Sequence, residues 1–421
     1  MARPSWRIIG ITGLIFFFAQ SVILSIYRRA SEIQEQMREK VEHARSIGIE
    51  SLLSDAPVSA KIVKMRKRIE ILNQQQVVQN TDQFGSFASQ SDSPVFVVQV
   101  HDRVLYLSSL IEALGNVQGI EECLLVFSHD IISNEINAVI RNITFARVLQ
   151  IYYPYTMQLF PMGYPGKDPK GVSFPKGYGR TPGLVQIKLH WVWKLTQVFR
   201  GIRELRNHTG PKIFLEDDHY VLPDALHVLR QILTMRKTSC PTCLPILGGY
   251  PTEMNLRWDL IRLSHFQSSG NNMGMVLDQS FWNTFYKCGF EFCTIDDYNW
   301  DWTLEHLNRK CFPQPLKILK VDAPRVWHVG DCGTHFRHSK FITGCRLTRL
   351  QSSLHKVRKL VEQKNASMFP GEIKQISPLQ LGSPDTPAPW GGWGDPRDHD
   401  LCLAIIKDWD KDWDSASGRT S

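Results

Sequence analysis

The sequence predicts an α/β fold built around a parallel sheet, and three observations support this class. The chain has 421 residues, 43% of them hydrophobic, which suits one large catalytic domain with additional segments at its ends. Short apolar runs alternate with helical patterns, as βαβ units require. Polar and acidic residues directly follow two of these runs, at the strand ends where open α/β sheets bind ligands.

The composition excludes several classes of protein. Charged residues make up 21% of the chain, which excludes wholesale disorder and, with the hydrophobic content, a polytopic membrane protein. The net charge of +8 is spread along the sequence without a Lys/Arg block, so we expect no nucleic-acid partner. Glycine-rich phosphate loops of the Walker or dinucleotide type are absent, which disfavours kinases and dehydrogenases.

Residues 8–26 form an uncharged apolar segment near the N-terminus. As a helix, its 19 residues would span about 28 Å, close to the thickness of the hydrocarbon core of a bilayer. A cleaved signal peptide is the alternative, but no small-x-small site closes the run. We therefore expect a signal-anchor transmembrane helix, although arginines on both sides of it leave its orientation open.

The cysteines indicate the compartment. Eight of the nine lie between Cys240 and Cys402, and Cys240-x-x-Cys243 lacks the matching pair that a zinc site would need. Disulfides in an oxidising lumen account for such a cluster. Three glycosylation sequons agree with this location: Asn142, Asn207 and Asn365. The sequence thus predicts a single-pass type II membrane protein with residues 1–7 in the cytosol.

Residues 27–93 are polar and are predicted to form a luminal stem. Apolar residues at Ile33, Met37 and Val41 allow a helix or a loose coiled coil, which leaves open a homodimer through the stem. A solvated stalk fits the composition better.

The catalytic domain is expected at 94–406, before an acidic and aromatic C-terminal tail at 407–421. The expected strands are 95–100, 124–127, 148–153 and 212–215. The expected helices are 104–114, 190–206 and 223–235. A loop rich in proline and glycine is expected at 161–185.

Three adjacent acids, Glu216, Asp217 and Asp218, follow the last expected strand. Their charges repel one another and lose hydration there, so a cation should compensate them. A hard divalent ion that bridges to a diphosphate would do this. The alternative is that the acids decorate the N-terminus of a helix that opens near Pro223. The tripeptide alone leaves both interpretations open.

Two further patterns carry candidate functional residues. The stretch 296–302 mixes carboxylates with two tryptophans, a combination suited to gripping a sugar while one acid deprotonates a hydroxyl. A helix cap is the alternative for Asp296 or Asp297. A lone histidine is usually structural, and His328 becomes a metal candidate only because the acidic triplet needs further ligands.

These stretches resemble the Golgi N-acetylglucosaminyltransferase II family, the alpha-1,6-mannosyl-glycoprotein 2-beta-N-acetylglucosaminyltransferases. The matching segments run in order from about residue 95 to 402: 97–103, 126–130, 190–194, 214–220, 293–303, 328–333 and 391–399. The Asp/Trp string at 293–303 is highly specific, whereas many nucleotide-sugar enzymes share the acidic triplet. The resemblance implies a GT-A fold, in which a Rossmann-like nucleotide-sugar half joins an acceptor half.

The resemblance also implies an activity. Family enzymes transfer GlcNAc from UDP-GlcNAc, with inversion, to O2 of the α-1,6-linked mannose of an N-glycan core in the Golgi membrane. By position, Asp218 and His328 correspond to the ligands of Mn²⁺. Asp301 corresponds to the catalytic base, with Asn299 and Trp300 beside it on the acceptor side.

Other positions correspond to substrate contacts and disulfides. The nucleotide-sugar-binding residues would be Gln99, Val100, His101, Asp102, Arg103, Asp130, Glu216 and Asp217. A further substrate-contacting segment would be Gln186, Ile187, Lys188, Leu189 and His190. The implied disulfides are Cys240–Cys243, Cys288–Cys311, Cys293–Cys402 and Cys332–Cys345. Cys123 is left over, and we expect it to be a buried free thiol.

The sequence departs from the family in two places. Residues 162–185 form a shorter loop without the usual additional cysteine pair, and Asn271–Gly274 stands where the family has His-Asn-Met-Gly. Two alternatives therefore remain: a related β-1,2-GlcNAc-transferase acting on the α-1,3 arm or on O-mannose, and a catalytically silent Golgi lectin. The retention of Asp218, Asp301 and His328 favours an enzyme.

Overall fold

The computed structural model describes residues 59–87, 92–160, 163–166, 179–250, 256–330, 347–364, 367–376 and 388–407. The predicted cytoplasmic tail, the signal-anchor segment and nearly all of the C-terminal tail lie outside these ranges. Within them, no helix combines the length and the apolar character needed to cross a membrane.

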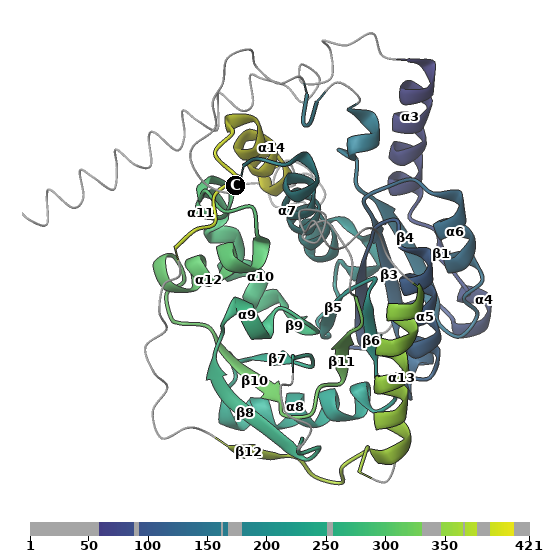
Figure 1. Ribbon diagram of the computed structural model, residues 1–421, viewed down its shortest axis with the longest axis vertical. Helices are drawn as coiled ribbons and strands as arrows, with labels where there is room; N and C mark the ends of the chain where they lie inside the picture. The colour runs from purple at the N-terminus through teal and green to yellow at the C-terminus, as the bar shows by residue number, and fades with distance from the viewer. Residues whose placement is uncertain are drawn as a thin grey trace, which may run out of the picture. The chain divides into compact units, whose positions relative to one another are not determined.

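A ten-stranded mixed sheet forms the centre of the described part (Figure 1). From edge to edge, its strands are β1 (Val78–Gln79), β4 (Arg147–Tyr152), β3 (Leu124–His129), β2 (Val95–Val100), β5 (Lys212–Glu216), β9 (Met275–Leu277), β7 (Leu244–Ile246), β10 (Lys317–Val321), β8 (Leu260–His265) and β12 (Lys374–Ile376). Strands β4, β3, β2 and β5 are parallel. In the other half, β9 runs antiparallel to both neighbours and β8 to β10. The predicted α/β class is therefore confirmed, with a parallel arrangement in the first half of the sheet.

The parallel strands are buried on both faces, as their continuous apolar sequences require. Alternate residues of β2 enter different cores, Val97 one and Val98 the other. Helices α5 (Val104–Gly115) and α6 (Asn134–Arg141) connect β2 to β3 and β3 to β4. Because these strands are parallel neighbours, their carboxyl ends lie at one edge of the sheet.

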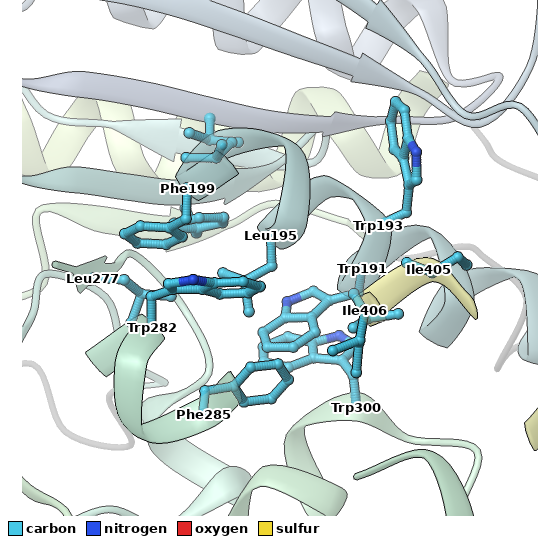
Figure 2. Packing of buried hydrophobic residues seen from close by; sticks show 14 of the residues in the cluster. Trp191, Trp193, Leu195, Phe199, Leu277, Trp282, Phe285, Trp300, Ile405 and Ile406 are labelled. Atoms are coloured by element: carbon cyan, nitrogen blue, oxygen red, sulfur yellow. The ribbon is translucent and has the colours of Figure 1, made fainter. Parts of the chain in front are cut away.

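Several helices from later in the chain share an aromatic core. They are α7 (Pro182–Thr196), α10 (Gln279–Lys287), α11 (Gly289–Thr294), α12 (Trp300–Lys310) and α14 (Pro396–Lys407). In this core (Figure 2), the ring of Trp191 stacks on that of Trp300 with centroids 4.6 Å apart. Helix α7 begins earlier than the predicted helix at 190–206, because proline suits the first turn of a helix. The stacking holds the start of α12 against α7.

The remaining elements are shorter or lie apart from this core. The helices are α3 (Ala60–Gln75), α4 (Thr81–Phe84), α8 (Ala225–Ser239), α9 (Ser268–Asn271) and α13 (Leu347–Lys364). Short 3₁₀ turns occupy Ile120–Glu122, Met157–Leu159 and Arg203–Leu205, and a π turn Gln197–Gly201. A separate two-stranded sheet pairs β6 (His219–Val221) with β11 (Val326–His328).

Residues 60–84, which the composition assigns to the stem, differ from that expectation. Helix α3 buries Ile69, and Asn73 exchanges two hydrogen bonds with the backbone of Tyr152 in β4, at 2.6 and 2.8 Å. Strand β1 then pairs with β4 at the edge of the main sheet. Ile62, Met65 and Leu72 pack beside Ile69 against Tyr152 and Leu159, so a few apolar residues in an otherwise polar helix suffice to dock it.

The structure contains three disulfides: Cys240–Cys243, Cys288–Cys311 and Cys293–Cys402. These are pairings that the resemblance implies, whereas Cys332 and Cys345 lie outside the described residues. Cys123 is a buried free thiol. Burial raises its pKa well above the usual range, so the thiol stays protonated and unreactive.

Candidate active site

Three neighbouring strands bring polar residues to one edge of the sheet. Strand β2 runs into His101–Arg103, β3 into Asp130, and β5 into Glu216–Asp218. The strands are parallel and adjacent in the order β3-β2-β5, so their carboxyl ends coincide. The structure therefore gathers segments of the chain that are more than a hundred residues apart.

Arg103 compensates two of the three adjacent acids. Its guanidinium bonds to Asp217 and, at 2.6 Å, to Asp218, with only 15% of the side chain exposed. Burial opposes ionisation of Asp218, but Arg103 and His328 hold the pKa of this carboxyl well below its usual range. The chain thus supplies part of the positive charge that the acidic triplet requires.

The pairing of β6 with β11 brings His328 to the same carboxylate. His219 and His328 are register partners in this antiparallel pair. His328 Nε2 lies 3.4 Å from Asp218 Oδ2, and the Val329 N–H donates to the Asp218 carbonyl at 2.9 Å. A side chain at Gly330 would meet Asp218 Oδ2 at 2.1 Å, so only glycine permits this close approach.

These groups could hold a divalent cation. Oδ1 of Asp218 is buried and has no hydrogen-bond partner in the described part of the chain, while 31% of the His328 side chain is exposed. Ligand atoms of Glu216, Asp218 and His219 lie within 4.8 Å of one another. Carboxylate and imidazole ligands suit Mn²⁺. Sequence reasoning missed His219, although it directly follows the acidic triplet.

Asp130 organises a second part of this edge. His101 Nδ1 donates to both of its carboxylate oxygens, at 2.8 and 2.9 Å. Burial works against protonation of His101, but Asp130 prevails and raises the pKa of the imidazole to about 9. Gln186 of α7 donates to the same carboxylate at 3.3 Å, and the His101 N–H donates to Asp217 at 3.0 Å. The more exposed carboxylate of Asp102 lies 3.5 Å from His101 Nε2.

Helix α7 contributes fewer side chains to this edge than the resemblance implies. Besides Gln186, His190 shares a hydrogen bond of 2.8 Å with Ser128. Lys194 donates to Gln99 at 2.7 Å, a contact that the sequence does not predict. Three other α7 side chains that the resemblance assigns to substrate contacts lie in or against the hydrophobic core instead: Ile187, Lys188 and Leu189. The same is true of Val100 at the end of β2.

Asp301 lies in the first turn of α12. Asn272 donates to its Oδ2 at 2.8 Å, and the Trp302 N–H donates to its Oδ1 at 2.9 Å. Burial raises the pKa of Asp301 to about 6, and these hydrogen bonds limit the rise. A carboxylate with such a pKa is matched to taking up a proton near neutral pH. Asn272 belongs to the stretch where the sequence departs from the family motif, and no sequence signal pairs it with Asp301.

The two residues that flank this carboxylate have structural contacts. Asn299 is the N-cap of α12, and its backbone N–H and side-chain amide both donate to Asp297 Oδ1. Trp300 is only 8% exposed because its ring stacks on Trp191. The side chain of Trp300 therefore faces the core. The pattern of apolar residues near the start of α12 does not predict this orientation.

Tyr250 shows that the acidic edge and Asp301 share one electrostatic environment. Its ring lies 6.0 Å from that of His328, centroid to centroid, and half of the side chain is exposed. Burial and three carboxylates raise its pKa to about 12: those of Glu216, Asp218 and Asp301. The carboxylates of the acidic edge and that of Asp301 thus act on the same tyrosine, an arrangement that could serve the displacement of a charged leaving group by a hydroxyl.

Comparison with known proteins gives a consistent result. The family model described as N-acetylglucosaminyltransferase II (MGAT2) matches residues 66–402. Proteins named alpha-1,6-mannosyl-glycoprotein 2-beta-N-acetylglucosaminyltransferase are similar to the chain over most of its length. The protein of Rattus norvegicus is 34% identical over 87% of this chain and 88% of its own length. That of Sus scrofa is 36% identical over 81% and 79%, and that of Arabidopsis thaliana 30% over 77% and 76%.

Proposed function

Because the chain belongs to the N-acetylglucosaminyltransferase II family, we propose that it transfers GlcNAc from UDP-GlcNAc to O2 of the α-1,6-linked mannose of an N-glycan core. The observation that carries this proposal is a pair of buried carboxylates, Asp218 and Asp301, that both raise the pKa of Tyr250. Asp218 is held ionised with one unpartnered oxygen, and Asp301 has a pKa near neutrality. Together with a sheet whose parallel half ends in this cluster, they support a GT-A arrangement.

Mn²⁺ is the proposed cofactor, with Asp218 and His328 as its protein ligands. The unpartnered Asp218 Oδ1 and the partly exposed imidazole of His328 fit such an ion. When bound, Mn²⁺ would neutralise charge on the departing diphosphate. Arg103 keeps Asp218 ionised and so ready to ligate, while His219 lies close enough to complete the set.

Asp301 is the proposed general base. Inversion needs a single in-line displacement at the anomeric carbon, in which the base removes the proton from the attacking mannose hydroxyl. Asn272 and the Trp302 N–H each bind one oxygen of this carboxylate, which fixes its direction. No covalent nucleophile is required, and Cys123, as a buried and protonated thiol, takes no part.

The donor contacts are proposed at the ends of β2, β3 and β5. His101, charged by its bond to Asp130, offers a cation beside the nucleotide-binding edge. Gln99 and Asp102, together with Glu216 and Asp217 of the acidic triplet, complete the polar groups there. Ile187 and Leu189 would support this edge from the core rather than bind substrate directly.

The sequence leaves two other activities open. A transferase for the α-1,3 arm or for O-mannose would use the same donor edge and differ only in the acceptor. A silent lectin would not need Asp218, Asp301 and His328 together, and the geometry that keeps Asp218 ionised and the pKa of Asp301 near neutrality favours an enzyme.

The proposed location is the Golgi membrane, with the catalytic domain in the lumen. The three disulfides support an oxidising compartment. The proposed anchor at 8–26 and any contact between two stems fall outside the described residues.

The test is a transfer assay with the full chain in detergent. The acceptor is a core glycan that already carries GlcNAc on its α-1,3 arm, supplied with UDP-GlcNAc and Mn²⁺. We expect one new β-1,2-linked GlcNAc on the α-1,6-linked mannose, identified by NMR of the product. Transfer only to a free α-1,3 arm or to O-mannose would support the related transferase, and no transfer to any acceptor would contradict an enzymatic function.

A further inference from the structure

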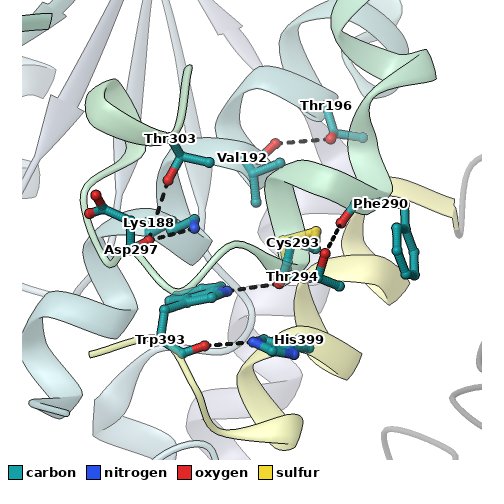
Figure 3. The surroundings of a disulfide bond; sticks show 11 residues. Lys188, Val192, Thr196, Phe290, Cys293, Thr294, Asp297, Thr303, Trp393 and His399 are labelled. Atoms are coloured by element: carbon teal, nitrogen blue, oxygen red, sulfur yellow. Dashed lines mark hydrogen bonds between the residues drawn. A yellow bond between two sulfur atoms is a disulfide. The ribbon is translucent and has the colours of Figure 1, made fainter. Parts of the chain in front are cut away.

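Lys188 is a buried lysine for which substrate binding offers no explanation. Its side chain is fully buried in α7, and burial of an amine is costly unless its contacts compensate. Its Nζ donates to the carbonyl of Asp297 at 2.7 Å (Figure 3). The same nitrogen lies 4.2 Å from the centre of the Trp393 ring and 4.9 Å from that of Phe292. Since no part of Lys188 reaches the surface, it does not touch a sugar.

Asp297 connects this buried amine to the start of α12. Its carbonyl accepts hydrogen bonds from Lys188 and, at 3.3 Å, from Thr303 Oγ1. Its carboxylate accepts the N–H groups of Asn299 at 2.9 Å and of Trp390 at 3.1 Å. Asn299 is the N-cap of α12, so every displacement of Asp297 is passed to the first turn of that helix.

The loop that contains Asp297 has little regular structure of its own. Between α11 and α12, the described backbone forms a single isolated bridge, from Asp297 to Gly391. The C-terminal segment that supplies this bridge is itself tied back, because Trp393 donates from its backbone to Asp296 and from its indole to the Cys293 carbonyl. The Tyr298 N–H also donates to the Gly391 carbonyl at 3.2 Å, and the Gly391 N–H to that of Asp296 at 2.9 Å. These two backbone bonds and the side-chain contacts together set the position of the loop.

We infer that Lys188 is a positioning residue for Asp301: by holding the Asp297 carbonyl, it fixes the start of α12 and hence the direction of the carboxylate. This inference rests on the proposed function, because it takes Asp301 as the general base. It assigns Lys188 a role inside the protein, whereas the family resemblance places it in a substrate-contacting segment. A misplacement of about 1 Å at a reacting group costs about a hundredfold in rate.

The test compares Lys188→Met with Lys212→Met in the full-length enzyme. Lys212 is a matched control: it is also buried, bonds to backbone carbonyls at 3.2 and 3.4 Å, and starts β5 at the end opposite to Glu216. Turnover is measured per UDP-binding site, so that a loss of folded protein does not count. We expect Lys188→Met to lower kcat tenfold to a hundredfold with an unchanged KM for UDP-GlcNAc, and Lys212→Met to leave kcat per site unchanged.

An equal kcat per site in the two variants would overturn the inference, whereas an inactive wild type would instead overturn the proposed function. If Lys188→Met does not fold, Thr303→Val tests the same helix start, because the Thr303 hydroxyl lies 3.3 Å from the Asp297 carbonyl oxygen and donates at 2.7 Å to that of the N-cap Asn299. A lower kcat per site at unchanged donor KM is then expected, and an unchanged kcat would overturn the inference. In either variant, a rise in donor KM without a change in kcat would also overturn it.

Discussion

The two sides of the candidate site are built in different ways. The proposed donor side consists of the ends of three adjacent parallel strands, whose hydrogen-bonded register brings Asp130 and Glu216–Asp218 together. The proposed acceptor side consists of one loop and the first turn of α12, held by Lys188, Trp393 and a disulfide to Cys402. The sheet joins its strand ends through regular backbone pairing, whereas the loop depends largely on individual side-chain contacts to distant segments. We therefore expect separate defects from changes on the two sides.

The largest effect on turnover is expected from Asp301→Asn on the acceptor side. The amide keeps the shape of the carboxylate but takes up no proton, so kcat should fall by about a thousandfold. The measurement is steady-state transfer at saturating donor. Asp259→Asn is the control, since Asp259 is a partly exposed acid that pairs with Arg257 and Lys374 at the other end of the sheet. Near-normal transfer by Asp301→Asn would remove Asp301 from the mechanism.

The next largest effect is expected from Asp218→Asn on the donor side. The variant loses the ionised oxygen that is proposed to hold Mn²⁺, so the metal concentration for half-maximal activity should rise by about tenfold or more. This is measured by titrating Mn²⁺ into the transfer reaction. Asp322→Asn, a change at an acid bonded to Arg262 away from the site, should leave the metal requirement as it is. An unchanged requirement in Asp218→Asn would place the metal elsewhere.

The pH dependence of kcat should follow the ionisation of Asp301 on the acceptor side. Because burial raises the pKa of Asp301 to about 6, its carboxylate is protonated below this pH and lost as a base. At saturating Mn²⁺ and donor, kcat should be level above about pH 7 and fall about tenfold per unit below pH 6.

Asn272→Ala sharpens this prediction. The variant removes a hydrogen bond that stabilises the charged form, so the acid limb should move to higher pH by about one unit. The pH–rate profile is measured for both forms. A limb that stays in place, or moves to lower pH, would show that Asn272 does not tune the base.

The smallest effect on turnover is expected from two disulfide removals. Cys293–Cys402 closes a separation of 109 residues and joins α11 to α14 next to the acceptor loop, whereas Cys240–Cys243 closes 3 residues behind the donor side. By loop entropy, their replacement by serine should lower the free energy of unfolding by about 5 and about 2 kcal/mol. Denaturant unfolding measures this. Only the replacement of Cys293–Cys402 should also lower kcat per UDP-binding site. A lower kcat after replacement of Cys240–Cys243 alone would contradict the proposed difference between the two sides.

This difference between the two sides also explains which parts of the site can be predicted from the sequence. The strand at 95–100 is found at its predicted bounds, and 212–215 differs from β5 by one residue, because continuous apolar runs with both faces buried are legible in local sequence. The acids that follow β5 can be placed at a strand end from the sequence for the same reason. The donor side is thus largely predictable once the strands are recognised.

The acceptor side is not predictable in this way. The tie between Lys188 and Asp297 joins positions 109 residues apart, and that between Asn272 and Asp301 joins positions 29 apart. Trp300 resembles a sugar-binding residue in the sequence, and only the packing against Trp191 shows that it is buried. Helix α3 is not predicted because only a few apolar residues in a polar sequence, together with Asn73, dock it on Tyr152 of β4 and on Leu159. Each case depends on a tertiary contact that no periodicity encodes.

The affinity for UDP in the presence of Mn²⁺ tests the division between the two sides most directly. Calorimetry on the wild type, Asp301→Asn and Asp218→Asn measures it without any acceptor. Asp301→Asn should bind within about twofold of the wild type although it does not transfer, and Asp218→Asn should bind about tenfold or more weakly. Equal weakening in both variants, or wild-type affinity in Asp218→Asn, would contradict the assignment of metal and base to separate sides of the site.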